Sequence, residues 1–188
     1  MSDRCPGENA DAQWVARARL GEEAAYTWLL DRYRMRAVRL ATHVLRRDAE
    51  AEDVAQEAFI QAFRSLKSLS MDGSFATWLM RIVVRLCIDR SRGARWQREV
   101  SSDFRVEPPG MPGDSQAGSI DTKILVGQLL DQLPPPARAA LVLRELEGMD
   151  YVQISHVLGV PVGTVRSRLN SARAQFRGLW LAACAEED

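Results

Sequence analysis

The strongest constraint on the fold of this chain lies in residues 150–177, where the sequence predicts two helices separated by a tight turn. Asp150 suits an N-cap, and the apolar spacing after it predicts a short helix that ends at Gly159, a residue that tolerates positive φ. In the second helix the apolar residues recur at spacings of four, three and four, the period of one helical face. These expected core residues are Val165, Leu169, Ala172 and Phe176. The pattern is that of a helix-turn-helix.

The face of the second helix opposite this stripe is basic, with four arginines and no acidic residue between 160 and 177. Such a face attracts phosphates and presents side chains that reach base edges in a DNA groove. Many amphipathic helices carry solvated arginines without binding nucleic acid. The DNA-binding interpretation therefore depends on the full order of cap, short helix, glycine, turn and second helix. The candidate DNA-facing residues are Thr164, Arg166, Ser167, Arg168, Asn170, Ser171 and Arg173.

Helical periodicity extends through most of the chain, and no stretch sustains the alternation typical of a β-strand. The predicted fold class is all-α, with two small helical domains joined by a flexible linker. The expected bounds are a first domain at 1–98, a proline- and glycine-rich linker at 99–119 and a second domain at 120–188. Helices are expected at 11–20, 22–45, 48–66 with Asp48 as N-cap, 75–93 starting from Ser74 or Gly73, 121–132 and 137–146.

Charge is segregated along a chain that is neutral as a whole, with 25 basic and 25 acidic residues. Any affinity for nucleic acid must therefore come from local basic surfaces. Residues 48–57 hold five acids and no base, whereas residues 75–98 hold six arginines and a single acid. The helix expected at 48–66 thus begins with an acidic segment, whereas the helix expected at 75–93 is basic.

The outward face of the helix at 48–66 combines Asp53, Gln56 and Glu57 with the apolar Ile60. This mixture predicts a docking surface for a basic protein partner, where complementary charge sets encounter and register. Two simpler interpretations stay open. Single apolar residues are often exposed, and acids in the first turn favour the positive end of a helix.

The helix expected at 75–93 is predicted to cradle a nucleic-acid backbone, because its arginines continue past its apolar stripe. Phe75 and Trp78 stand at its start, where an aromatic ring either stacks on an unpaired base or anchors the core. The candidate core residues are Leu79, Ile82, Val83, Leu86 and Ile88, and the candidate DNA-binding arginines are Arg81, Arg85, Arg92 and Arg95.

Several classes of protein are not expected. Three widely spaced cysteines argue against a disulfide framework or a zinc site, and Cys87 is expected to be a buried small residue rather than a redox sensor. No signal-like or membrane-spanning apolar run is present, which predicts a cytoplasmic protein without membrane insertion. The histidines are isolated, so no catalytic residues, metal, cofactor or small-molecule substrate are expected.

Three segments in order resemble the extracytoplasmic-function group of bacterial sigma factors. They are residues 51–64 (AEDVAQEAFIQAFR), residues 75–83 (FATWLMRIV) with Asp89, and residues 163–169 (GTVRSRL) with Ala172 and Arg173. The resemblance spans about residues 11 to 180. It implies a region-two domain, a linker threading toward the polymerase active-site cleft, and a region-four domain.

The resemblance also implies roles and partners. Core RNA polymerase would be bound through its β′ clamp helices and β subunit, with Glu52, Asp53, Gln56 and Glu57 matching the acidic docking motif. Residues 75–95 would open and read the minus-ten element, and the loop at 67–74 would pocket a flipped base. On the last helix Arg166, Ser167, Asn170 and Ser171 would read the minus-thirty-five element in promoter DNA, while Arg168 and Arg173 grip phosphates. Sequestration by an anti-sigma factor is usual for the group.

Two positions depart from the family pattern, so the promoter sequence does not transfer. Arg85 stands where the family often has asparagine, and Ser171 stands where it often has arginine. The chief alternative function is a stand-alone helix-turn-helix regulator, which leaves the acidic surface and residues 75–95 unexplained. A small recombinase-like enzyme would need a carboxylate cluster or nucleophile near the basic groove, and Asp89 alone does not supply one.

Overall fold

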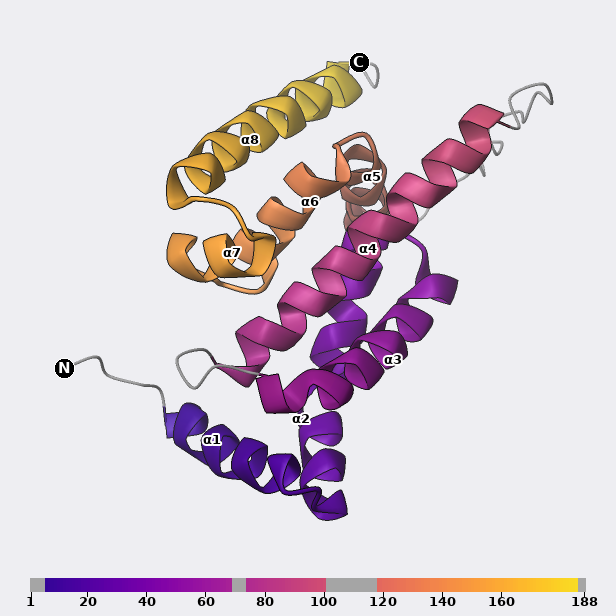
Figure 1. The fold of residues 1–188 in the computed structure, drawn as a ribbon. Coiled ribbons are helices and arrows are strands. Elements are labelled where there is room, and N and C mark those ends of the chain that lie inside the picture. The colour runs from indigo at the N-terminus through magenta and orange to yellow at the C-terminus, as the bar shows by residue number, and fades with distance from the viewer. Residues whose placement is uncertain (1–5, 69–73, 101–117, 186–188) are drawn as a thin grey trace.

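The computed structural model describes residues 6–68, 74–100 and 118–185, and every regular element within these ranges is helical (Figure 1). The predicted all-α class is therefore confirmed. The elements are α1 (Pro6–Arg19), α2 (Glu23–Leu45), α3 (Asp48–Ser65), the short 3₁₀ turn η1 (Leu66–Ser68), α4 (Phe75–Val100), α5 (Gly118–Asp131), α6 (Pro135–Leu141), the π-helical turn η2 (Val142–Leu146), α7 (Tyr151–Leu158) and α8 (Val162–Ala185).

The helix starts follow the predicted capping at α4 and α7 but not at α3. Ser74 Oγ accepts the Thr77 N–H at 3.2 Å, which caps α4. The prediction of Asp48 as N-cap was wrong, because Arg47 holds that position and makes no side-chain cap bond. Asp48 already lies in the first helical turn, where its negative charge still favours the positive helix end.

Three helix boundaries differ from the expected ones. α4 runs to Val100, past the expected end near Gly93, because an exposed glycine inside a helix costs only about 1 kcal/mol. α5 begins at Gly118, and α6 ends at Leu141, where the chain continues as η2. The expected linker at 99–119 therefore overlaps the two flanking helices, and its residues 101–117 lie outside the described part of the chain.

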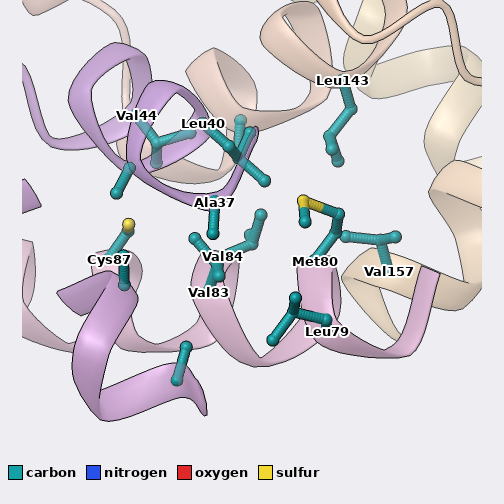
Figure 2. Packing of buried hydrophobic residues seen from close by; sticks show 14 of the residues in the cluster. Ala37, Leu40, Val44, Leu79, Met80, Val83, Val84, Cys87, Leu143 and Val157 are labelled. Carbon is teal, nitrogen blue, oxygen red and sulfur yellow. The ribbon is translucent and has the colours of Figure 1, made fainter. Parts of the chain in front are cut away.

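α4 is the central element of the molecule. It packs against α2 and α3 on one side and against α6 and α7 on the other, so it lies between α1–α3 and α5–α8 (Figure 1). The buried apolar residues form one continuous core through both groups of helices. Figure 2 shows Met80 of α4 close to Leu143 of η2 and Val157 of α7. The two halves of the chain are thus joined by side-chain packing.

This two-sided contact explains an error in the predicted core of α4. Of the expected core residues, Leu79 and Val83 are buried, whereas Ile82, Leu86 and Ile88 are only half-buried. A core predicted from one apolar stripe assumes that only one side of the helix is covered. Since α7 covers a further part of the helix, the buried residues of α4 beyond Phe75 are instead Leu79, Met80, Val83, Val84 and Cys87.

Candidate functional site

The helix-turn-helix forms as predicted, with α7 and α8 joined at Gly159. Gly159 has φ of 64° in the left-handed region, and it closes α7 by donating its N–H to the Ser155 carbonyl. Val165, Leu169 and Ala172 are buried under α8. Phe176 is only half-buried, contrary to its prediction as a core residue; it packs against the edge of the core, and its ring lies beside that of Trp180 with centroids 6.4 Å apart.

Asp150 is the N-cap of α7, and it forms a reciprocal capping box with Gln153. The Gln153 N–H donates to Asp150 Oδ1 at 2.8 Å, and the Asp150 N–H donates to Gln153 Oε1 at 2.9 Å. These bonds fix where the first helix of the motif begins.

The capping box leads to a stability prediction. Asp150→Ala should lower the free energy of unfolding by about 1 kcal/mol, because the Gln153 N–H loses the carboxylate that accepts its hydrogen bond. Urea denaturation followed by circular dichroism measures the change. Asp48→Ala is the matched control, since Asp48 is not the cap of α3, and it should cost less. Equal losses in the two variants would contradict the assigned role of Asp150.

The outer face of α8 is open to solvent at the positions expected to contact DNA. Arg168 and Arg173 are half-buried, and the exposed residues are Thr164, Arg166, Ser167, Asn170 and Ser171. Ser167 Oγ donates to the Thr164 carbonyl at 3.0 Å, so its hydroxyl is engaged locally within the first turn. The amide of Asn170 and the guanidinium of Arg166 are therefore the long polar groups that this exposed face projects.

Two arginines of α8 have contacts that sequence reasoning did not anticipate. The guanidinium of Arg173 lies 2.7 Å from Glu145 of η2, and that of Arg166 lies 5.9 Å from the centre of the Tyr151 ring. Tyr151 begins α7, and its ring also faces Arg144 at 5.1 Å. The available signal in the sequence was the aromatic Tyr151 next to the N-cap Asp150. Its position in the sequence does not reveal that Arg144 and Arg166 lie over its ring. These contacts hold the arginine stems at the edge of the exposed face.

The acidic surface on α3 faces outward as expected. Asp53, Gln56 and Ile60 are exposed, and Ile60 is 43% accessible. Glu57 is half-buried and pairs with Arg90 of α4 at 3.2 Å, while Glu52 lies 3.9 Å from Arg34 of α2. Among the described residues, no ion pair or hydrogen bond engages the carboxylate of Asp53. Asp53 is thus the acid of this surface that is most available to an outside partner.

The structure distinguishes Phe75 from Trp78 at the start of α4. For both of these aromatic residues the sequence allowed either stacking on an unpaired base or a place in the core. Phe75 is 2% exposed and packs on Tyr33 with ring centroids 5.4 Å apart. Phe75 is therefore a core residue whose ring packs toward α2. A ring this deeply buried is not accessible for stacking on a base, contrary to its prediction as a DNA-binding residue. Trp78 is half-buried, and part of its ring stays accessible. The expected base-pocketing loop at 67–74 lies largely outside the described residues, which resume at Ser74.

The basic side of α4 is exposed along the described part of the helix. Arg81, Arg85 and Arg92 all reach solvent, and Arg85 lies 3.8 Å from Asp89 one turn away. A pair this exposed contributes little to stability, so a phosphate can replace the carboxylate as partner. Arg95 lies in the last turns of α4, and its side chain is outside the described residues. The exposed arginines of α4 and α8 make two separate basic faces.

Cys87 is fully buried in α4, and burial raises the pKa of its thiol to about 12. The thiol therefore stays protonated at neutral pH, as the interpretation of Cys87 as a small buried residue expects. Among the described side chains, no group of three histidines, cysteines or acids is arranged to hold a metal ion. None of the helices in the described ranges has the length and apolar character needed to cross a membrane.

The fold and these surfaces are those of a helical protein with a helix-turn-helix, two basic faces and one acidic face. Two family models match the chain: sigma-70 region 2 at residues 29–97 and sigma-70 region 4 at residues 123–176. The RNA polymerase sigma-H factor of Pseudomonas aeruginosa is 36% identical over 177 residues, which cover 88% of this chain and 91% of the relative. The extracytoplasmic-function (ECF) sigma-E factor of Escherichia coli K12 is 33% identical over 174 residues, covering 87% and 90%.

Solved structures agree with this assignment. The structure of CnrH in complex with the cytosolic domain of CnrY matches with a TM-score of 0.70 and 25% identity over 92% of this chain and 98% of that one. The sigma factor RpoE from Bartonella quintana, solved with the anti-sigma factor NepR, has the same fold with a TM-score of 0.66. The chain belongs to the sigma-70 family of RNA polymerase sigma factors, in its extracytoplasmic-function group. Members of this family are transcription initiation factors and not enzymes.

Proposed function

We propose that this sigma factor docks on core RNA polymerase through α3 and reads a promoter with α4 and α8. The observation that carries the assignment is the placement of three exposed faces on three helices: acids on α3, and arginines on α4 and α8. The order of these faces matches the order of the sigma-70 regions. The first domain, residues 1–98, would serve docking and the minus-ten element, and residues 120–188 would serve the minus-thirty-five element, with 99–119 as the connection.

The contribution of this chain to initiation is binding energy. Arg166 and Asn170 would hydrogen-bond base edges in the major groove, while Arg168 and Arg173 neutralise phosphates. Arg81, Arg85 and Arg92 would hold the backbone of the opened strand, and Trp78 offers a ring for an unstacked base. Capture of such bases offsets the few kcal/mol that unpairing costs at each step. The polymerase performs the phosphodiester chemistry.

A run-off transcription assay tests the function directly. Purified core RNA polymerase is incubated with and without this protein on the DNA upstream of its own gene. A discrete transcript that depends on the protein is the expected result. Absence of that transcript, together with failure of the protein to co-elute with core polymerase, would favour the stand-alone helix-turn-helix regulator.

Asp53→Lys should weaken binding to core polymerase at least tenfold, about 1.4 kcal/mol, because it places a cation on a surface that faces a basic partner. Asp53 is the cleaner position, since Glu57 also tethers α4 through Arg90. Co-elution and fluorescence titration with core polymerase measure the loss. Asp31→Lys, the same charge change at an exposed position of α2, is the control. Equal effects of both variants would show that net charge matters and that the surface does not.

Two further properties belong to this proposal. Of the two solved structures described above, one holds CnrH with the cytosolic domain of CnrY, and the other holds the sigma factor RpoE with the anti-sigma factor NepR. Control of this chain by an anti-sigma factor is therefore proposed, as is a location in the cytoplasm, where the polymerase acts. Pull-down of the tagged protein from cells in which it is inactive, with and without inducing stress, tests the first of these.

A further inference from the structure

We propose that a buried ion pair holds the free chain in a closed form, in which the two helical halves pack together and cannot span a promoter. The pair forms between Glu147, in the turn that follows η2, and two arginines of α2. Arg36 Nε lies 2.6 Å from Glu147 Oε2, and Arg39 Nη2 lies 3.5 Å from Oε1. We call these three residues the Glu147 latch.

The geometry of the latch sets it apart from the surface ion pairs of this molecule. The side chain of Glu147 is 2% exposed, whereas Glu145, two residues earlier, is 53% exposed and pairs within its own half of the chain. A carboxylate removed from water needs charged partners, and here both come from a helix more than a hundred residues away in sequence. The closed form is thus the arrangement in which this buried charge has partners: Arg36 donates a hydrogen bond to Oε2, and Arg39 pairs with Oε1 by charge alone.

Two other contacts cross the same boundary. Met80 packs near Leu143 and Val157, and the buried guanidinium of Arg138 donates to the carbonyl of Val44 at the end of α2 at 3.2 Å. Arg138 also donates to the carbonyl of Leu133 at 3.3 Å, which ties the start of α6 to the end of α2. The second half therefore presents an acid and a base to the same helix, and together they fix its orientation.

The chemistry of the latch suits a contact that forms and breaks. A buried ion pair gains little net stability over its hydrated groups, but it defines one geometry because any other leaves a charge without a partner. When the halves separate, Glu147 and both arginines regain water, so opening leaves no buried charge behind. A cavity of about 460 Å³ adjoins the pair, and Arg36, Glu147 and Gln153 are among the residues that line it.

The consequence for DNA follows from the direct contact between α4 and α7. If the chain reads minus-ten and minus-thirty-five elements, as the function proposed above requires, its two reading faces must reach sites about 25 base pairs apart, or about 85 Å at about 3.4 Å per base pair. Helices packed side by side cannot reach both sites. Opening of the latch is therefore the step that allows both elements to be bound at once.

The test measures the distance between the two halves in the full-length chain, without polymerase or DNA, so its outcome is independent of the proposed function. One fluorophore is attached to Gln61→Cys on α3 and the other to the exposed Cys184 on α8, in a Cys5→Ser background. Cys87 is buried and stays unlabelled. The wild-type latch should give a single population with efficient energy transfer. Glu147→Lys should lose that transfer, because three cations then face one another.

Glu145→Lys is the matched control. It makes the same charge change two residues away, on an acid whose partner Arg173 belongs to the same half, and it should retain the wild-type transfer. The reverse change, Arg36→Glu with Arg39→Glu, should also open the chain. Combined with Glu147→Lys it should close the chain again, since opposite charges then meet. Circular dichroism checks that each variant keeps its helices. If Glu147→Lys does not fold, the loss of transfer in the Arg36→Glu, Arg39→Glu variant tests whether the ion pair holds the halves together.

Three results would overturn the proposal. Weak transfer in the wild-type chain would show that the free protein is open. Unchanged transfer in the folded Glu147→Lys variant would show that the ion pair does not hold the halves. Failure of the combined variant to regain transfer would show that the contact does not depend on charge pairing at this position.

Discussion

Alanine at both Arg166 and Asn170 is expected to weaken binding of the holoenzyme to the upstream promoter element by about 2 to 6 kcal/mol, because each good side-chain pairing with a base contributes about 1 to 3 kcal/mol. Both residues lie on the exposed face of α8, and neither supports the core beneath it. Fluorescence anisotropy of a labelled duplex titrated with reconstituted holoenzyme measures the loss. The affinity for unrelated duplexes should fall much less.

The control for this prediction is Gln175→Ala, an exposed position on the same helix that was not assigned to DNA. A second comparison separates base contacts from phosphate contacts. Arg168→Ala should weaken binding to all sequences alike and reduce the slope of log affinity against log salt by about 1. If the double variant binds the promoter as tightly as the wild-type protein, α8 is not the reading helix.

Leu143→Ala is expected to lower the free energy of unfolding by about 2 to 5 kcal/mol, the usual cost of a cavity at a fully buried leucine. Leu143 is completely buried in η2, where it lies among residues from both halves of the chain (Figure 2). The surrounding helices cannot easily collapse onto the space, because η2 continues directly from α6 and the Met149 N–H after it donates to the Leu143 carbonyl at 3.0 Å. Urea denaturation should show a lower midpoint with an unchanged slope.

Leu146→Ala provides the same chemical change three residues later, at a side chain that is 53% exposed. Its effect should stay within about 0.5 kcal/mol, as is usual for surface positions. Similar losses at Leu143 and Leu146 would mean that η2 does not pack as the structure has it. A change in slope for Leu143→Ala alone would instead indicate that the unfolding is no longer two-state.

The parts of the structure that were predictable from sequence are those determined by neighbouring residues. The cap at Asp150, the positive φ at Gly159 and the stripe of Val165, Leu169 and Ala172 depend on local chemistry and on one helical period. The exposed face of α8 follows from the same stripe, since a residue opposite a buried face is exposed. For this reason the candidate DNA-binding positions on α8 are predictable without any tertiary contact.

The parts that sequence reasoning missed depend on which helices meet. Met80 and Val84 are buried because α4 is covered on two sides, and no spacing within α4 reveals the second one. Phe75 could not be separated from Trp78 until α2 was placed beside it. Glu147 resembled an ordinary surface acid in a turn, because its arginine partners lie far away in sequence. The acidic and basic segments were evident, but the contact between the two halves was not.

The contact between α4 and α7 has a consequence for the newborn chain. Met80 leaves the ribosome well before Val157, and at about 5 to 20 residues per second the interval is about 4 to 15 seconds. During that time the side of α4 that later meets α7 has no covering helix, while α2, α3 and their packing residues are already complete. A polymerase that meets the nascent protein therefore finds its first half before any closure exists, and translation itself provides a brief period in which the latch has not yet been made.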